Sequence, residues 1–126
     1  MLTVFVFSAV YLAVAIGFPN PSVPGRAQFA WRLAAWVACL IAFAIHFAIE
    51  HFRFHRRPVA VARHVGGAVA LGAFGLAIAA SVHRARNGMG NHSLLTLALV
   101  VWPILAGGMA FLVAWGGAAV LDRQRE

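Results

Sequence analysis

The sequence predicts an all-α fold, a polytopic membrane protein built as a bundle of four transmembrane helices. The first reason is composition: 63% of the 126 residues are hydrophobic and only 10% are charged, whereas a soluble domain carries about 25% charged residues. The second is that the apolar residues form four runs, at residues 2–18, 28–52, 59–82 and 94–121. No long polar linker separates these runs, so residues 1–126 are predicted to form a single domain.

The first run, residues 2–18, would reach about 26 Å as a helix, which just spans a thin hydrocarbon core. A cleaved signal peptide is the alternative, but such a peptide begins with basic residues, and the first eight residues carry no charge. Ala9, Ala13 and Gly17 recur at four-residue spacing, a pattern that lets a second helix approach closely. Three prolines within residues 19–24 then exclude a helix.

The second run contains a row of small side chains at every fourth residue. Every fourth residue from Ala30 to Ala42 is an alanine, and the same spacing continues to His46 and Glu50. Residues four apart lie on neighbouring turns of one helix face, so the row forms a ridge that suits close packing. It also brings His46 and Glu50 together, and Pro58 ends the helix.

The third run, residues 59–82, carries small residues on several sides. This pattern predicts the most buried helix, in contact with at least two others, and replacing Gly67 or Gly72 by leucine should then disrupt assembly by overpacking. The fourth run, residues 94–121, exceeds the ~20 residues that a span needs. Pro103 predicts a kink within it because proline has no N–H to donate.

Four spans place both termini on one side of the membrane. Arginine is the only basic residue type besides histidine, and its distribution favours cytoplasmic termini in a multi-pass protein of the cell inner (plasma) membrane. Six arginines flank the terminal side and four the other: Arg53, Arg56, Arg57, Arg63, Arg123 and Arg125 against Arg26, Arg32, Arg84 and Arg86.

The stretch from His46 to His64 concentrates the polar chemistry of the chain. It holds four of the six histidines, four of the ten arginines and Glu50, the only acidic residue before Asp122. If the second and third helices form an antiparallel hairpin that turns near Pro58, Glu50 lies opposite His64, about two turns inside the helix end.

Ionisable residues at membrane depth mark proton and ion pathways, and histidine titrates near neutral pH. The candidate residues for handling a proton or ion are Glu50, His46, His64, Arg63 and Arg53. The structural alternative is a buried ion pair between Glu50 and one of the nearby arginines, which would only lock the hairpin.

The histidines of this stretch also raise the questions of a bound haem and of a bound metal ion. His51 and His64 come from adjacent helices and could act as axial ligands of a haem b, most easily at a subunit interface. A metal ion is not expected, because His51 points about 100° away from Glu50 on a helix and the spacing matches no common closed metal site.

The sequence therefore predicts a small non-enzymatic membrane protein, a homo-oligomer that binds or passes a small ion or solute near Glu50. The alternative is a non-catalytic accessory or anchor subunit of a membrane complex, associated with haem or quinone. The expected partners are the lipid bilayer and further copies or other membrane subunits. Nucleic acid is not expected, because the arginines lie between apolar runs and no nucleic-acid-binding motif is present.

Overall fold

The computed structural model describes residues 2–17, 25–54, 57–86 and 92–124, and helices are the only regular elements among them. The helices are α1 (Leu2–Gly17), α2 (Arg26–Ala48), a π-helical turn η1 (Ile49–Arg53), α3 (Pro58–Arg86) and α4 (His92–Arg123). The predicted all-α class is confirmed for these residues. The three prolines of the first predicted turn and His55 lie outside them.

Three helical stretches are long and apolar enough to cross a membrane, which indicates a membrane protein. They are Phe29–Arg53, Pro58–Val82 and Thr96–Arg123, and they correspond to the second, third and fourth predicted runs. Helix α1 is also apolar but has 16 residues. At 1.5 Å per residue it reaches about 24 Å, which is short of a typical hydrocarbon core of ~30 Å.

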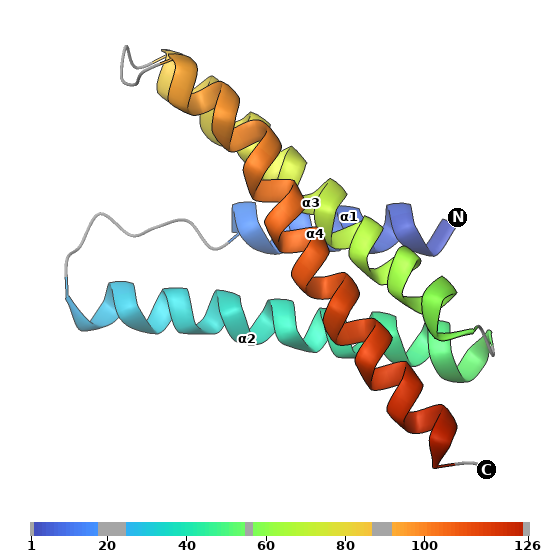
Figure 1. Ribbon diagram of the computed structural model, residues 1–126. Helices are drawn as coiled ribbons and strands as arrows, with labels where there is room; N and C mark the ends of the chain where they lie inside the picture. Colours follow the sequence, from blue (N-terminus) through green and yellow to red (C-terminus); the bar gives the residue numbers. More distant parts are fainter. Residues whose placement is uncertain (1, 18–24, 55–56, 87–91, 125–126) are drawn as a thin grey trace.

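The helices form two antiparallel pairs, α1 with α2 and α3 with α4, and the second pair crosses the first obliquely (Figure 1). Proline begins α3 because the first position of a helix needs no N–H, and the Arg57 carbonyl accepts the bonds of the first turn from Ala60 and Val61. Helix α4 continues through Pro103 as one helix of 32 residues.

Helix α3 is the central helix, as its small residues predicted. It packs along α4 and α1, and its residues Val61, Ala62, Val65 and Ala68 are fully buried. The α3–α4 contact is so close that a Cβ atom added at Gly107 would lie 2.6 Å from the Cβ of Ala70. Small residues on one or both helices thus allow their backbones to approach closely.

The two glycines singled out in the third run differ in their surroundings. A Cβ atom at Gly72 would lie 2.8 Å from the Cβ of Tyr11 on α1, whereas a Cβ atom at Gly67 would meet nothing within 4 Å. The prediction that a larger residue disrupts packing is therefore supported at Gly72. At Gly67 a Cβ atom meets no neighbour within one chain, so the effect of leucine on assembly stays a prediction.

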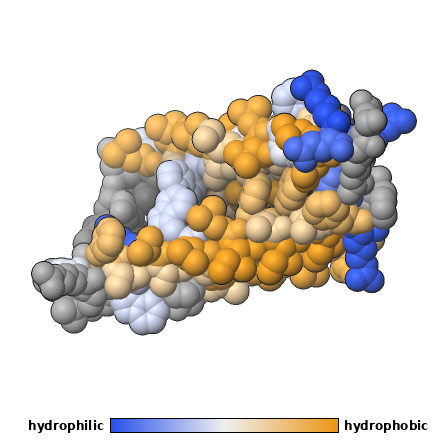
Figure 2. All heavy atoms as spheres, turned by 90° about the horizontal axis from the view of Figure 1, so that it is seen from below, coloured by the Kyte–Doolittle hydropathy of each residue, from blue (hydrophilic) through white to orange (hydrophobic). Residues whose placement is uncertain are grey.

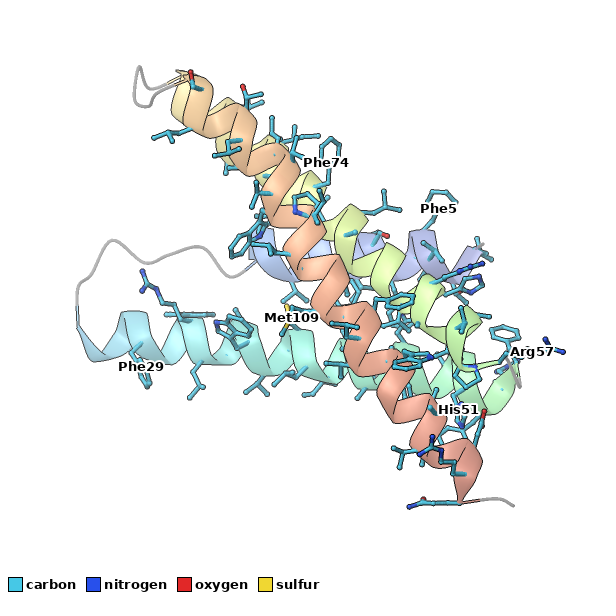
Figure 3. All side chains as sticks on the ribbon, in the orientation of Figure 1. Phe5, Phe29, His51, Arg57, Phe74 and Met109 are labelled. Carbon is cyan, nitrogen blue, oxygen red and sulfur yellow. The ribbon has the colours of Figure 1, made fainter. Side chains whose placement is uncertain are left out.

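Helix α2 joins the other helices only over its C-terminal half. Along its row of small residues, Ala30 and Ala34 are exposed, whereas Ala42, His46 and Glu50 are buried. The diverging half leaves an apolar cleft of about 470 Å³ between α2 and the α3–α4 pair. Met109 points from α4 toward α2 across this space (Figure 3).

Charged side chains gather at the end of the molecule where η1 turns into α3. Arg53, Arg57, Arg63 and Arg123 are exposed there, and Figure 2 shows polar atoms at this end beyond a largely apolar surface. Arg57 points outward in Figure 3. This distribution matches a helical bundle whose middle faces lipid and whose end reaches the headgroups.

Candidate functional site

Helices α1, α2 and α3 and the π-helical turn η1 contribute to a polar cluster around Glu50, which we call the Glu50 site. Its members are Thr3 from the start of α1, His46 from α2, Glu50 from η1 and His64 from α3. The contact between Glu50 and His64 confirms the predicted antiparallel register, in which residues at equal distance from the turn at Pro58 share a depth. The start of α1 therefore lies at the same end as the α2–α3 turn.

Both carboxylate oxygens of Glu50 have polar neighbours. The Thr3 hydroxyl donates to Oε1 at 2.6 Å, and Nδ1 of His64 lies 2.9 Å from Oε2. Glu50 is fully buried, whereas the side chain of His64 is 17% exposed. A ring nitrogen and a carboxylate oxygen at this separation can share one proton directly, so the pair can take up and release a proton within the protein.

His46 lies beside this pair but is not hydrogen-bonded to it. Its Nε2 atom is 3.9 Å from Oε1 of Glu50, too far for a hydrogen bond. The ring is fully buried and stacks on Phe7 of α1, with centroids 4.1 Å apart and planes 1° from parallel. Neither ring nitrogen has a hydrogen-bond partner in the part of the chain that the structure describes. Buried polar groups without a partner are unusual in folded proteins.

The π-helical turn explains how Glu50 and His51 are both buried although they are consecutive. In η1 the N–H of Phe54 bonds to the carbonyl of Ile49, five residues back. This wider turn changes the directions of the side chains relative to an α-helix, and π turns occur frequently at functional sites. The 3.6-residue periodicity of α2 correctly paired His46 with Glu50, but it could not indicate that His51 is also enclosed.

The predicted arginines lie differently from the histidines. Arg53 and Arg63 are both exposed, whereas the Glu50 carboxylate is fully buried between Thr3 and His64. The structure thus brings His46 and His64 to Glu50 and places the guanidinium-bearing side chains toward the surface of the same end.

The two candidate haem ligands have different carboxylate neighbours. His64 contacts Glu50, whereas Nε2 of His51 lies 3.7 Å from Oδ1 of Asp122 near the end of α4. Haem ligation by this pair would require His51 to turn away from Asp122. Among the described residues, no group of three or more His, Cys, Asp and Glu side chains has an arrangement that could hold a metal ion.

Sequence reasoning missed three participants: Thr3, Phe7 and Asp122. Thr3 and Phe7 belong to α1, and their contacts with η1 and α2 cross more than 35 residues of sequence. Asp122 lies just after the fourth apolar run, residues 94–121, where the apolar pattern gives no hint of a contact with His51. The one available signal was that Thr3 and Ser8 are the only hydroxyl-bearing residues of the first run apart from Tyr11.

Comparison with protein-family models, with curated proteins and with solved structures finds no match for this chain.

Proposed function

We propose that this chain is a four-span protein of the cell inner membrane that takes up and passes protons, or another small ion, at Glu50. In this proposal α1 inserts alongside the three longer helices, both termini are cytoplasmic, and the protein works as a homo-oligomer. Because α1 is shorter than a typical span, the bilayer thins around it or flanking residues reach out to the interface.

The observation that carries the proposal is the combination of a buried carboxylate with two histidines. The contact between Glu50 and His64 offers a proton a second position 2.9 Å away. The neighbouring ring of His46 has two nitrogens without a hydrogen-bond partner among the described residues, so it can accept a proton after a small movement. An imidazole ring can bind a proton at either of two nitrogens, which suits a relay that must both load and release.

The competing explanation is that Glu50 only fastens the helices together. Thr3 and His64 would then serve as hydrogen-bond donors that make a buried carboxylate tolerable. A purely structural role accounts for these two contacts. It gives no reason for the buried, unsatisfied ring of His46, and the proton-handling proposal does.

Glu50→Gln separates the two explanations, because it keeps the shape of the side chain but cannot ionise. The purified variant is tested for thermal stability in detergent and for proton flux in liposomes that contain a pH-sensitive dye. Glu50→Asp, which keeps a carboxyl group, is the matched control. Proton handling predicts normal folding and a loss of flux, with a pH dependence that His46→Ala also changes.

A structural role predicts the opposite pattern. Glu50→Gln would then lower stability, and removing a charged partner as well would restore much of the loss in a double-mutant cycle. If Glu50→Gln changes neither stability nor flux, the carboxylate has no essential part and the proposed function is wrong.

The second candidate function is an accessory or anchor subunit of a larger membrane complex. The apolar cleft between α2 and the α3–α4 pair favours it, because about 470 Å³ lined by groups such as Trp36 and Trp102 could receive apolar side chains of a partner. Purification in detergent as a stable homo-oligomer would favour proton handling, and an unstable monomer would favour the subunit. A Soret band in the pure protein would instead support haem.

A further inference from the structure

Arg63 is a charged residue within the apolar stretch of α3, and the function proposed above does not use it. It is the only arginine, lysine or acidic residue between Pro58 and Val82, the part of α3 that is long and apolar enough to cross a membrane. Its side chain is exposed, although Ala62 and Val65 beside it are fully buried. Arg63 therefore lies on the outer side of α3, which in a membrane meets lipid.

The bundle does not supply a carboxylate partner for Arg63. The ion pairs among the described side chains each join a carboxylate to a histidine, and Arg63 takes part in none of them. The Glu50 carboxylate is fully buried between Thr3 and His64. A guanidinium group is costly in hydrocarbon unless it is paired or reaches the interface, so its partner has to come from outside the bundle.

The depth of Arg63 places its charge within reach of lipid headgroups. The stretch Pro58–Val82 has 25 residues and is about 37 Å long at 1.5 Å per residue, which exceeds a hydrocarbon core of ~30 Å. If this stretch is centred in the core, the Cα atom of Arg63 lies about 4 Å inside the hydrocarbon boundary. The flexible stem of an arginine can lie along the helix at such a depth while the guanidinium reaches the headgroups.

The face of α3 that carries Arg63 is apolar and open toward the middle of the helix. Val59, Gly67 and Leu71 share this face, because residues four apart lie on neighbouring turns. Val59 is 44% exposed and Leu71 is 46% exposed. A Cβ atom added at Gly67 would meet nothing within 4 Å. An acyl chain can therefore approach the α3 backbone at Gly67, one turn from the guanidinium-bearing residue.

The surrounding charge favours an anionic lipid over a zwitterionic one. Arg53, Arg57 and Arg123 are also exposed at this end, where Figure 2 shows hydrophilic side chains beyond the apolar surface. Among the acids that the structure describes, only Asp122 is exposed. Clusters of basic residues beside a membrane span attract headgroups with a net negative charge.

We propose that Arg63 binds the phosphate of an anionic phospholipid whose acyl chain lies against α3 at Gly67. The planar guanidinium can donate two parallel hydrogen bonds to phosphate oxygens, which a point charge cannot do. The site lies on the outer surface of α3, whereas the Glu50 carboxylate is enclosed between helices. Lipid binding at Arg63 therefore does not depend on proton handling at Glu50.

Arg63→Gln tests the headgroup contact. Native mass spectrometry of the full chain in a neutral detergent measures the affinity for phosphatidylglycerol and for phosphatidylcholine with the same acyl chains. Wild type should bind phosphatidylglycerol more tightly, and Arg63→Gln should lower this affinity roughly fivefold, the contribution of one basic residue near an anionic surface. Arg32→Gln is the matched control, because it removes an exposed arginine from the far end of α2 and should keep the wild-type affinity.

Gly67→Leu tests the position of the acyl chain. The larger side chain fills the open space, so it should weaken binding of both lipids to a similar extent and leave the preference for phosphatidylglycerol unchanged.

Three results would overturn the proposal. Wild type might bind the two lipids equally, which would show no selection of charge. Arg32→Gln could lower the phosphatidylglycerol affinity as much as Arg63→Gln, which would show a general effect of net charge without a site at Arg63. Finally, wild-type binding of both lipids by Gly67→Leu would mean that no acyl chain lies at this position.

Discussion

Gly72→Ala tests how α1 sits against the central helix, with Gly67→Ala as its control in the same helix. An alanine Cβ at Gly72 would lie 2.8 Å from the Cβ of Tyr11 and 3.3 Å from the main-chain oxygen of Ser8, whereas at Gly67 it would meet nothing within 4 Å. The Tyr11 Cβ and the Ser8 oxygen are both held by the α1 backbone and cannot rotate away. An alanine at Gly72 therefore forces α1 and α3 apart.

The magnitude follows from comparing the two variants. Overpacking of this kind costs about 1–3 kcal/mol, and the gain in helix propensity from glycine to alanine, roughly 1 kcal/mol, occurs in both variants and cancels between them. Gly72→Ala should therefore be less stable than Gly67→Ala by about 1–3 kcal/mol, which is roughly a 5- to 150-fold change in the unfolding equilibrium.

The assay is reversible unfolding in mixed micelles of a non-ionic detergent and dodecyl sulfate, followed by tryptophan fluorescence and circular dichroism. Midpoints are compared at equal slopes, so that a change in midpoint reports a change in stability. If Gly72→Ala is as stable as Gly67→Ala or more stable, α1 does not pack on α3 at this position.

Three further predictions concern other contacts. Gly107→Ala should destabilise the protein by about 1–3 kcal/mol in the same assay because of Ala70. Gly108→Ala, which meets nothing within 4 Å, should not; equal midpoints for these two variants would contradict the α3–α4 contact. Thr3→Val should lower the free energy of unfolding by about 1.5–3 kcal/mol, because it removes a donor to a buried carboxylate. Thr3→Ser keeps the hydroxyl and should retain most of this stability; a Thr3→Val variant as stable as wild type would exclude the bond. A reporter fused after Glu126 should be active only in its cytoplasmic form, and one in the α3–α4 connection only in its periplasmic form; the reverse result would invert the proposed orientation.

The helices could be predicted from the sequence because run length and proline placement act locally. The second, third and fourth apolar runs lie within helices whose ends extend at most a few residues beyond the predictions. The pairing of Glu50 with His64 also followed, since a hairpin that turns at Pro58 fixes which residues share a depth. These are consequences of helix geometry alone.

The rest depended on packing between distant segments, which leaves no periodic signal in one sequence. Nothing near Thr3 indicates that its hydroxyl would reach η1, and nothing near Ala30 indicates that α2 would diverge there and open a cleft. The π turn was equally hidden, because it depends on which neighbours enclose Glu50 and His51 from both sides. Helical periodicity assumes a regular turn and fails where the turn widens.

Helix α1 packs against segments from later in the sequence, which constrains the order in which the helices can assemble. Helix α1 finds these partners only after Glu50 and then Gly72 have been synthesised. Until then the Thr3 hydroxyl and the apolar faces of α1 lack these packing partners. The helix also has no acidic residue in its first turn and no basic residue in its last turn to anchor it. The α3–α4 hairpin can assemble from helices that are neighbours in sequence, whereas α1 must wait for contacts that are synthesised after it.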